Sequence, residues 1–133
     1  MDVVAHFKGA RNVSSIPAGL VLFREGEPGK EMFILMQGTV EISVGGDVVE
    51  VATPGALLGE MALVDSSARS ATVITRSQCK FVAVDGRQFD LLVRESPEFA
   101  RHVMSVMANR LRTMNQRLRE AIGELSVRGT RPK

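Results

Sequence analysis

The sequence predicts an α+β fold in which short strands come first and helices follow. Over the first two thirds of the chain, apolar segments of strand length alternate with turns rich in Gly and Pro, a spacing typical of a sandwich or barrel. From Asp85 onward the apolar residues recur at helical intervals instead. With 133 residues the chain is expected to form one domain. Its expected parts are strands over about 12–84, helices over about 86–125 and a tail at 126–133.

Five elements are predicted before residue 53. They are a short helix at 2–8 and strands at 20–23, 32–36, 40–44 and 48–51. The run at 32–36 is wholly apolar, as expected of a strand buried on both faces. Residues 40–44 instead alternate apolar and polar side chains, which is the period of a half-buried strand. Gly45-Gly46-Asp47 follows directly and predicts a hairpin between the last two strands.

Residues 58–73 combine the features of an anion-binding site. Gly59 has no Cβ, so the backbone can approach a ligand closely there. The apolar segment 61–64 is expected to form one or two helical turns, and free N–H groups at a helix start favour negative charge. Arg69 adds a planar donor fork suited to two phosphate oxygens. Glu60 would repel a phosphate, so it is expected to face another group, such as a sugar hydroxyl.

This stretch resembles the phosphate-binding cassette of the cyclic nucleotide-binding domain family. The family pattern is roughly aromatic-Gly-Glu-hydrophobic-small-Leu, a loop, and then Arg-small-Ala-Thr-Val. Here the two halves are Leu58-Gly59-Glu60-Met61-Ala62-Leu63 and Arg69-Ser70-Ala71-Thr72-Val73. Leu58 replaces a frequent aromatic residue and Ala68 a frequent proline, and both differences concern packing or loop stiffness. Spacing alone leaves open the alternative of an ordinary Gly-Glu pair and a surface arginine.

The resemblance implies both the fold and the ligand. The fold would be an antiparallel β-roll of the jelly-roll type, with a short N-terminal helix, a short cassette helix and a long C-terminal helix. The ligand would be a cyclic 3′,5′-nucleotide whose phosphate pairs with Arg69 and whose ribose 2′-OH donates to Glu60, while Gly59 gives the backbone room. Further phosphate contacts would come from the backbone N–H groups of Met61, Ala62 and Ala71 and from the Ser70 hydroxyl.

The residue after the cassette arginine bears on the choice of base. Members of the family that select cyclic GMP often have threonine at the position of Ser70. Serine leaves the choice open, and we expect cyclic AMP to be favoured over cyclic GMP.

After the cassette, residues 79–84 are expected to form a strand that pairs with residues 71–75. Cys79 lies at the start of this strand and is the single cysteine of the chain. One cysteine excludes an internal disulfide, and its apolar surroundings predict a buried thiol.

Two helices are expected to close the domain. Asp85 can cap a helix that carries Phe89, and Ser96-Pro97 predicts the start of a long helix reaching to about Glu124. The β-roll is expected to pack against four apolar side chains of that helix: Phe99, Val103, Val106 and Met107. Apolar residues alternate spacings of three and four along it, as in a coiled-coil seam: Met104, Met107, Leu111, Met114, Leu118, Ala121 and Leu125. Nothing in the chain is left to cover the outer part of the seam, so we expect a homodimer through this helix.

In the family the C-terminal helix covers the base. When the resemblance is aligned on residues 108–111, Met114 and Asn115 fall at base-contacting positions, partly across a dimer. Asn115 can both donate and accept hydrogen bonds and so could read a base edge, and Arg112 is a third candidate. Repacking of the helices over the ligand would make the chain a sensor. The ligand can shift the helices between their two arrangements only by as much as its affinity differs between them.

Composition argues against several other classes of function. The net charge of +2 is too small to indicate a nucleic-acid partner by itself. Basic residues do exceed acidic ones after residue 109, which fits a solvated helix face and a basic tail or, alternatively, a docking surface for an acidic partner. No apolar run approaches the roughly 20 residues that cross a bilayer, and the N-terminus lacks the pattern of a signal peptide. We therefore expect a cytoplasmic protein.

The chain is not expected to be an enzyme or to hold a metal or cofactor. It has no Ser–His pair and no CxxC motif, and its two histidines cannot supply a metal site.

Two alternatives to a sensor remain: a truncated regulatory domain of a larger transcription factor or ion channel, and a ligand-free interaction module with the same fold. A DNA-reading helix-turn-helix would need about 60 more residues than the chain has.

Overall fold

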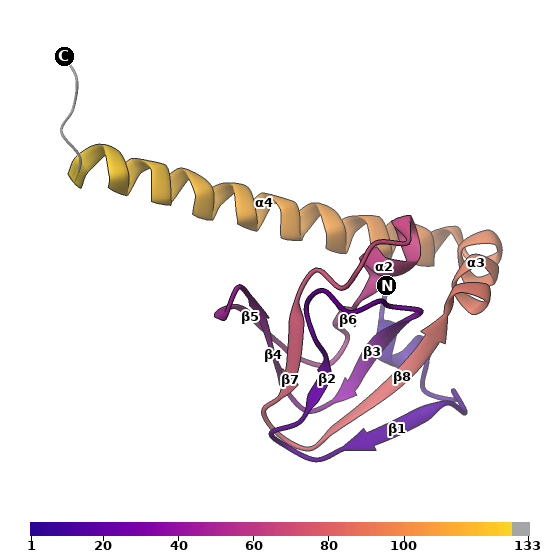
Figure 1. The fold of residues 1–133 in the computed structure, drawn as a ribbon. Coiled ribbons are helices and arrows are strands. Elements are labelled where there is room, and N and C mark those ends of the chain that lie inside the picture. Colours follow the sequence, from indigo (N-terminus) through magenta and orange to yellow (C-terminus); the bar gives the residue numbers. More distant parts are fainter. Residues whose placement is uncertain (129–133) are drawn as a thin grey trace.

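The computed structural model describes residues 1–128, and it shows two antiparallel sheets with helices gathered at one end (Figure 1). The helices are α1 (Val3–His6), α2 (Glu60–Asp65), α3 (Gly86–Glu95) and α4 (Pro97–Arg128). The strands are β1 (Val13–Ile16), β2 (Val21–Phe23), β3 (Glu31–Gln37), β4 (Val40–Val44), β5 (Asp47–Ala52), β6 (Leu57–Leu58), β7 (Thr72–Thr75) and β8 (Cys79–Asp85). The predicted α+β fold, a β-roll with short helices and a long C-terminal helix, is confirmed.

The end of the chain differs from the expectation. The tail predicted at 126–133 is helical up to Arg128, because α4 continues to that residue. Residues 129–133 of the predicted tail lie outside the described part.

Each sheet has four strands. One sheet has the order β1-β8-β3-β6 and the other the order β2-β7-β4-β5. The predicted hairpin joins β4 to β5, and both Gly45 (φ 59°) and Gly46 (φ 87°) have the positive φ that a tight hairpin turn requires.

The predicted pairing of residues 79–84 with residues 71–75 is wrong. β7 pairs with β2 and β4, whereas β8 crosses to the other sheet and pairs with β1 and β3. Closeness in sequence favours a hairpin, but β8 pairs with β1 on one side and β3 on the other, so its backbone N–H and C=O groups find partners without β7. Two strands were not predicted from the sequence: β1, which is largely exposed, and β6, which has two residues.

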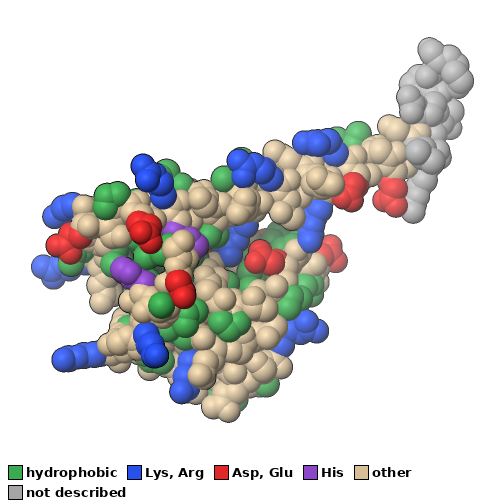
Figure 2. Space-filling view, turned by 180° about the vertical axis from the view of Figure 1, so that it is seen from behind, with side chains coloured by type: hydrophobic (Ala, Val, Ile, Leu, Met, Phe, Trp, Pro, Cys, Tyr) green, Lys and Arg blue, Asp and Glu red, His purple; other side chains and the backbone are tan. Residues whose placement is uncertain are grey.

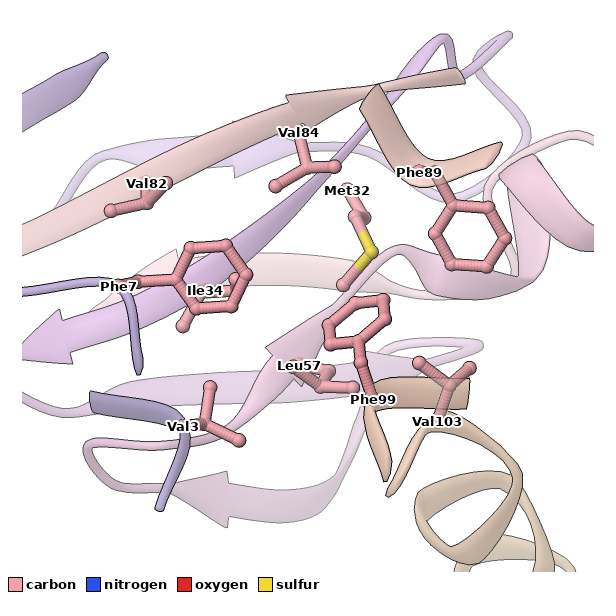
Figure 3. Close-up of a cluster of buried hydrophobic side chains, with 10 residues drawn as sticks. All are labelled: Val3, Phe7, Met32, Ile34, Leu57, Val82, Val84, Phe89, Phe99 and Val103. Carbon is pink, nitrogen blue, oxygen red and sulfur yellow. The ribbon is translucent and has the colours of Figure 1, made fainter. Parts of the chain in front are cut away.

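A first apolar cluster holds the helices against the sheet that contains β3 and β8 (Figure 3). It consists of Val3, Phe7, Met32, Ile34, Leu57, Val82, Val84, Phe89, Phe99 and Val103. Phe99 lies between two other rings, with its centroid 6.0 Å from that of Phe7 and 6.1 Å from that of Phe89. Burial of Phe99 and Val103 was predicted and is confirmed. The first turns of α4 are therefore fixed to the roll.

The helix starts follow the predicted signals. The Asp85 side chain accepts from the backbone N–H of Gln88, and the Gln88 side chain accepts from the backbone N–H of Asp85, which together form a capping box at α3. The Ser96 hydroxyl accepts from the backbone N–H of Phe99 at 3.2 Å and caps α4.

A second apolar cluster fills the space between the sheets and includes Cys79, whose predicted burial is confirmed.

The last part of α4 stands clear of the roll. Figure 1 shows the helix crossing the end of the roll near α2 and then continuing beyond it, and Figure 2 shows the same extension from behind. Its apolar side chains from Leu111 onward are exposed: Leu111, Met114, Leu118, Ile122 and Leu125. Among the described residues, no helix is both long enough and apolar enough to cross a membrane.

Candidate ligand-binding site

A cavity of about 710 Å³ lies between α2, the two strands β4 and β5, and the middle of α4. It brings together every cassette residue singled out from the sequence: Gly59, Glu60, Met61, Ala62, Arg69, Ser70 and Ala71. Phe23 and several aliphatic side chains complete its walls. The cavity is thus largely apolar, with a few polar groups at defined places, as in most small-molecule sites.

Arg69 is the buried cation of this cavity. Its side chain is 8% exposed, and its Nη1 donates to the carbonyl oxygen of Glu31 at 2.6 Å. Its Nε is buried and has no hydrogen-bond partner. Burial lowers the pKa of the Arg69 guanidinium from its usual value, and the carboxylates of Glu31 and Glu27 act in the opposite direction. An anion beside Nε would offset the cost of burying this charge.

Gly59 allows Arg69 to lie where it does. Gly59 has φ 79°, a left-handed conformation that side chains rarely adopt, and it caps the start of α2. A Cβ at this position would overlap Arg69 Nη1 and would lie 3.3 Å from the Phe23 ring. The position therefore requires glycine both for its backbone angle and for its contacts.

Glu60 is a buried carboxylate with one oxygen paired and one free. The residue is 1% exposed, and its Oε1 forms an ion pair with Nη1 of Arg110. Arg110 also donates to the carbonyl oxygen of Leu57 at 2.6 Å and lies 3.6 Å from the carboxylate of Glu50. Glu60 Oε2 is buried and has no partner. Glu60 can thus accept one further hydrogen bond from a group inside the cavity.

One face of α4 closes the cavity. Its lining residues are spaced at helical intervals: Val106, Asn109, Arg110, Thr113, Met114 and Arg117. Of the three candidates for contact with the base, Met114 lines the cavity, whereas Asn115 and Arg112 are exposed and do not line it. Arg112 instead donates to Asn109 Oδ1 at 3.2 Å.

Four cavity residues on this helix were not predicted from the sequence: Asn109, Arg110, Thr113 and Arg117. Their spacing of three and four from Val106 was the available signal, because residues so spaced share one helix face. Arg117 also donates to the carbonyl oxygen of Val49 in β5. Arg110 and Arg117, two turns apart, therefore both tie α4 to the wall of the cavity formed by β5.

The polar groups of the cavity suit binding of an anion next to a hydroxyl. Within residues 1–128, no three His, Cys, Asp or Glu side chains gather closely enough to hold a metal ion. The cavity offers a buried donor on Arg69, a buried acceptor on Glu60 and the first N–H groups of α2.

The chain is similar to known proteins both in sequence and in fold. The sequence pattern of the cyclic nucleotide-binding domain family matches residues 13–96. A cyclic nucleotide-gated potassium channel of Mesorhizobium japonicum is 37% identical over 98 residues, which are 74% of this chain and 27% of the channel. A CRP-like cAMP-activated global transcriptional regulator of Mycobacterium tuberculosis is 27% identical over 111 residues, which are 80% of this chain and 50% of the regulator. The chain thus spans half or less of the length of these curated relatives.

A solved structure of "Sp-2Cl-cAMPS bound to PKAR CBD2" resembles this fold with a TM-score of 0.69 and 26% identity, covering 86% of each chain. The family match ends at residue 96, so the cavity residues on α4 rest on the geometry alone. Since the family pattern covers most of the chain, this protein belongs to the cyclic nucleotide-binding domain family.

Proposed function

We propose that the chain binds a cyclic 3′,5′-nucleotide in this cavity and acts as a regulatory sensor. The observation that carries the proposal is an unpaired donor and an unpaired acceptor, Arg69 Nε and Glu60 Oε2, both buried at one cavity. Buried polar atoms without partners are rare because each costs free energy. A cyclic phosphate supplies the acceptor that Arg69 lacks, and a ribose 2′-OH supplies the donor that Glu60 lacks.

The remaining phosphate contacts fall on α2 and the start of β7. The backbone N–H groups of Met61 and Ala62 belong to the first turn of α2, where no intrahelical acceptor exists for them. The Ser70 hydroxyl makes only a weak contact of 3.7 Å to Met61 Sδ, which a phosphate oxygen would replace. Together with the backbone N–H of Ala71 these groups would surround the anion.

Glu60 also connects the ligand to α4. Its Oε1 binds Arg110 of α4 while its Oε2 would bind the ribose, so the ligand and the helix share one carboxylate. A ligand that changes the position of Glu60 changes the docking of α4, and the reverse holds by linkage. This shared group is our proposed route from binding to a regulatory output.

The base would lie against α4. Thr113 and Met114 line the cavity there and could contact a purine. Asn115 and Arg112 lie outside the lining in this arrangement, so a role in base recognition would require α4 to repack or a second chain to be present. The preference for cyclic AMP over cyclic GMP remains part of the proposal.

We further propose that α4 forms a homodimer through its exposed seam. Leu118 and Leu125 are 59% and 70% exposed, and they lie on the predicted coiled-coil seam. On one side of the seam, Arg110 pairs with Glu60 and Arg117 donates to the Val49 carbonyl, both within the same chain. On the other side of the seam, the uncharged Asn115 would lie next to the partner chain. Two copies could therefore meet along the seam without like charges facing each other.

Binding rather than catalysis is proposed, together with a cytoplasmic location and no nucleic-acid partner for this chain. A ligand-free interaction module is the alternative that the following experiment excludes or supports. Isothermal titration of the purified chain with cyclic AMP, cyclic GMP and 5′-AMP should give heat with the cyclic nucleotides, strongest with cyclic AMP. Charge-assisted hydrogen bonds contribute about 1.5–3 kcal/mol each, so Arg69→Ala should weaken binding roughly tenfold to more than a hundredfold.

Two results of this titration would contradict the proposal. The first is the absence of heat and of any melting shift at millimolar cyclic nucleotide. The second is binding that Arg69→Ala leaves unchanged.

A further inference from the structure

We infer that Phe23 and Gly29 form a socket that positions Arg69, holding one end of its guanidinium so that the Nε edge is left for the phosphate. This inference rests on the proposed cyclic nucleotide binding and names residues outside the cassette on which that binding depends. Phe23 lies in β2, Gly29 lies in the loop between β2 and β3, and both are more than 35 residues from Arg69 in sequence.

The Phe23 ring is the floor of the socket. Arg69 Cζ lies 4.2 Å from the centroid of this ring and 5.9 Å from that of Phe33. The two rings are themselves stacked, with centroids 6.1 Å apart and planes 27° apart. A buried guanidinium over an aromatic face is attracted by the ring electrons and loses freedom of rotation. Phe23 therefore fixes the plane in which the guanidinium lies.

Gly29 forms one wall of the socket. A Cβ on Gly29 would lie 2.6 Å from both Cζ and Nε of Arg69, which is closer than any ordinary contact. Gly29 does not have a positive φ, so alanine would fit the backbone and would collide only with the guanidinium. Glycine is needed here because of Arg69 and not because of the turn.

The loop before β3 also holds Arg69 by hydrogen bonds. The Glu31 carbonyl accepts from Nη1, while the Arg69 backbone N–H donates to the Glu27 carbonyl and its carbonyl accepts from the Gly26 N–H, both at 2.8 Å. These bonds fix the backbone and one terminal nitrogen of Arg69, whereas Nε has no partner. The guanidinium is thus positioned before a ligand arrives, which lowers the entropic cost of binding.

The test compares one substitution at two glycines. Gly29→Ala should weaken cyclic AMP binding at least about tenfold, as expected for loss of a well-placed pairing with the phosphate. Gly9→Ala is the matched control, because a Cβ there meets nothing and the backbone has no positive φ. It should leave the dissociation constant within about twofold. Calorimetric titration of both variants and of the unsubstituted chain gives the comparison.

A double substitution shows whether the effect acts through Arg69. In an Arg69→Ala background, Gly29→Ala should cost no further affinity, whereas a general structural effect would add to the loss. Phe23→Leu should weaken cyclic AMP binding about as much as Gly29→Ala. Phe23→Tyr keeps the aromatic face and should retain most of the affinity of the unsubstituted chain.

A second measurement needs no nucleotide. In the unliganded chain, the Arg69 Nε–H resonance should be displaced by the Phe23 ring current, and Phe23→Leu should remove the displacement. The inference is overturned if Gly29→Ala binds like the unsubstituted chain, if its loss persists without Arg69, or if the resonance is unaffected by Phe23→Leu. Failure of the unsubstituted chain to bind cyclic nucleotide contradicts the proposed function first, and the role in phosphate positioning with it.

Discussion

The two halves of α4 have similar apolar spacing but different surroundings. In the first half Phe99 and Val103 are buried against the roll, and the half ends at Arg110 on the ion pair with Glu60. In the second half Leu118 and Leu125 are exposed. The cavity lies where the packed half gives way to the free half. An apolar stripe on a helix therefore indicates that the stripe is covered, but it does not say by which surface. The cavity lies at the point on α4 where packing against the β-roll stops.

Substitutions in the two halves should change the free energy of unfolding by very different amounts. The largest effect is expected from Phe99→Ala, which opens a space between the rings of Phe7 and Phe89 and should cost about 3–5 kcal/mol. Chemical denaturation followed by circular dichroism measures this cost. A loss below about 1 kcal/mol would mean that the first turns of α4 are not anchored by this ring.

Arg110 should contribute less, because it is partly exposed and acts through one carboxylate. Arg110→Met keeps the apolar stem but leaves both oxygens of the buried Glu60 without a cation, at a cost of about 1–3 kcal/mol. Hydrogen exchange should rise in α4 around Thr113 and stay unchanged around Phe99. Equal exchange in the variant and the unsubstituted chain would show that the ion pair does not hold the helix over the cavity.

His102 should make a smaller contribution that depends on pH. Burial lowers the pKa of His102 below its usual 6.5, and the positive N-terminus acts in the same direction. Its Nε2 is buried without a partner. The unfolded chain then binds a proton that the folded chain does not, so stability should fall as pH drops below about 6.5 and level off below the folded pKa.

His102→Gln should remove this part of the pH dependence. Denaturation of the variant and of the unsubstituted chain at about pH 7.5 and about pH 5.5 measures this difference. If the variant keeps the same difference in stability between the two pH values, the lowered pKa of the partly buried His102 is contradicted.

The smallest effect on folding is expected in the free half. Leu118→Gln should change the free energy of unfolding of the isolated chain by less than about 0.5 kcal/mol, because the side chain is exposed. The same substitution should weaken the proposed homodimer, which sedimentation over a range of concentrations would detect. A monomer at all concentrations in the unsubstituted chain would contradict the dimer, and so would a dimer that Leu118→Gln leaves intact.

Features of the site that depend on neighbouring residues were predictable from the sequence, whereas contacts made by the docked α4 were not. That the cassette residues lie together was predictable because Gly59, Glu60 and Arg69 fall within eleven residues of each other, and their identities in this register resemble the pattern of a known family. The helix starts were predictable because capping is local. By contrast, Arg110 meets Glu60 across 50 residues, and such contacts depend on how α4 is docked.

The geometry of the helix is the physical reason why the residues of α4 that line the cavity were not all predicted from the sequence. Successive residues point about 100° apart around a helix, so Asn115 and Thr113 face different directions although they are two positions apart. Only the docked helix places Thr113 at the cavity and Asn115 outside the lining. The pairing of β8 with β1 and β3 also depends on contacts distant in sequence. Two apolar runs joined by a short turn can belong to different sheets, as β7 and β8 do.

In the proposed complex, one ligand joins Arg69 to Glu60 through a phosphate and a ribose hydroxyl. The most direct measurement is a calorimetric titration of the chain with cyclic AMP, with 2′-deoxy cyclic AMP and with adenosine, which lack the hydroxyl and the phosphate respectively. Removing either group should weaken binding at least about tenfold, since each leaves one buried polar atom of the cavity unpaired. Equal affinity for all three compounds, or no binding of cyclic AMP, would contradict the claim.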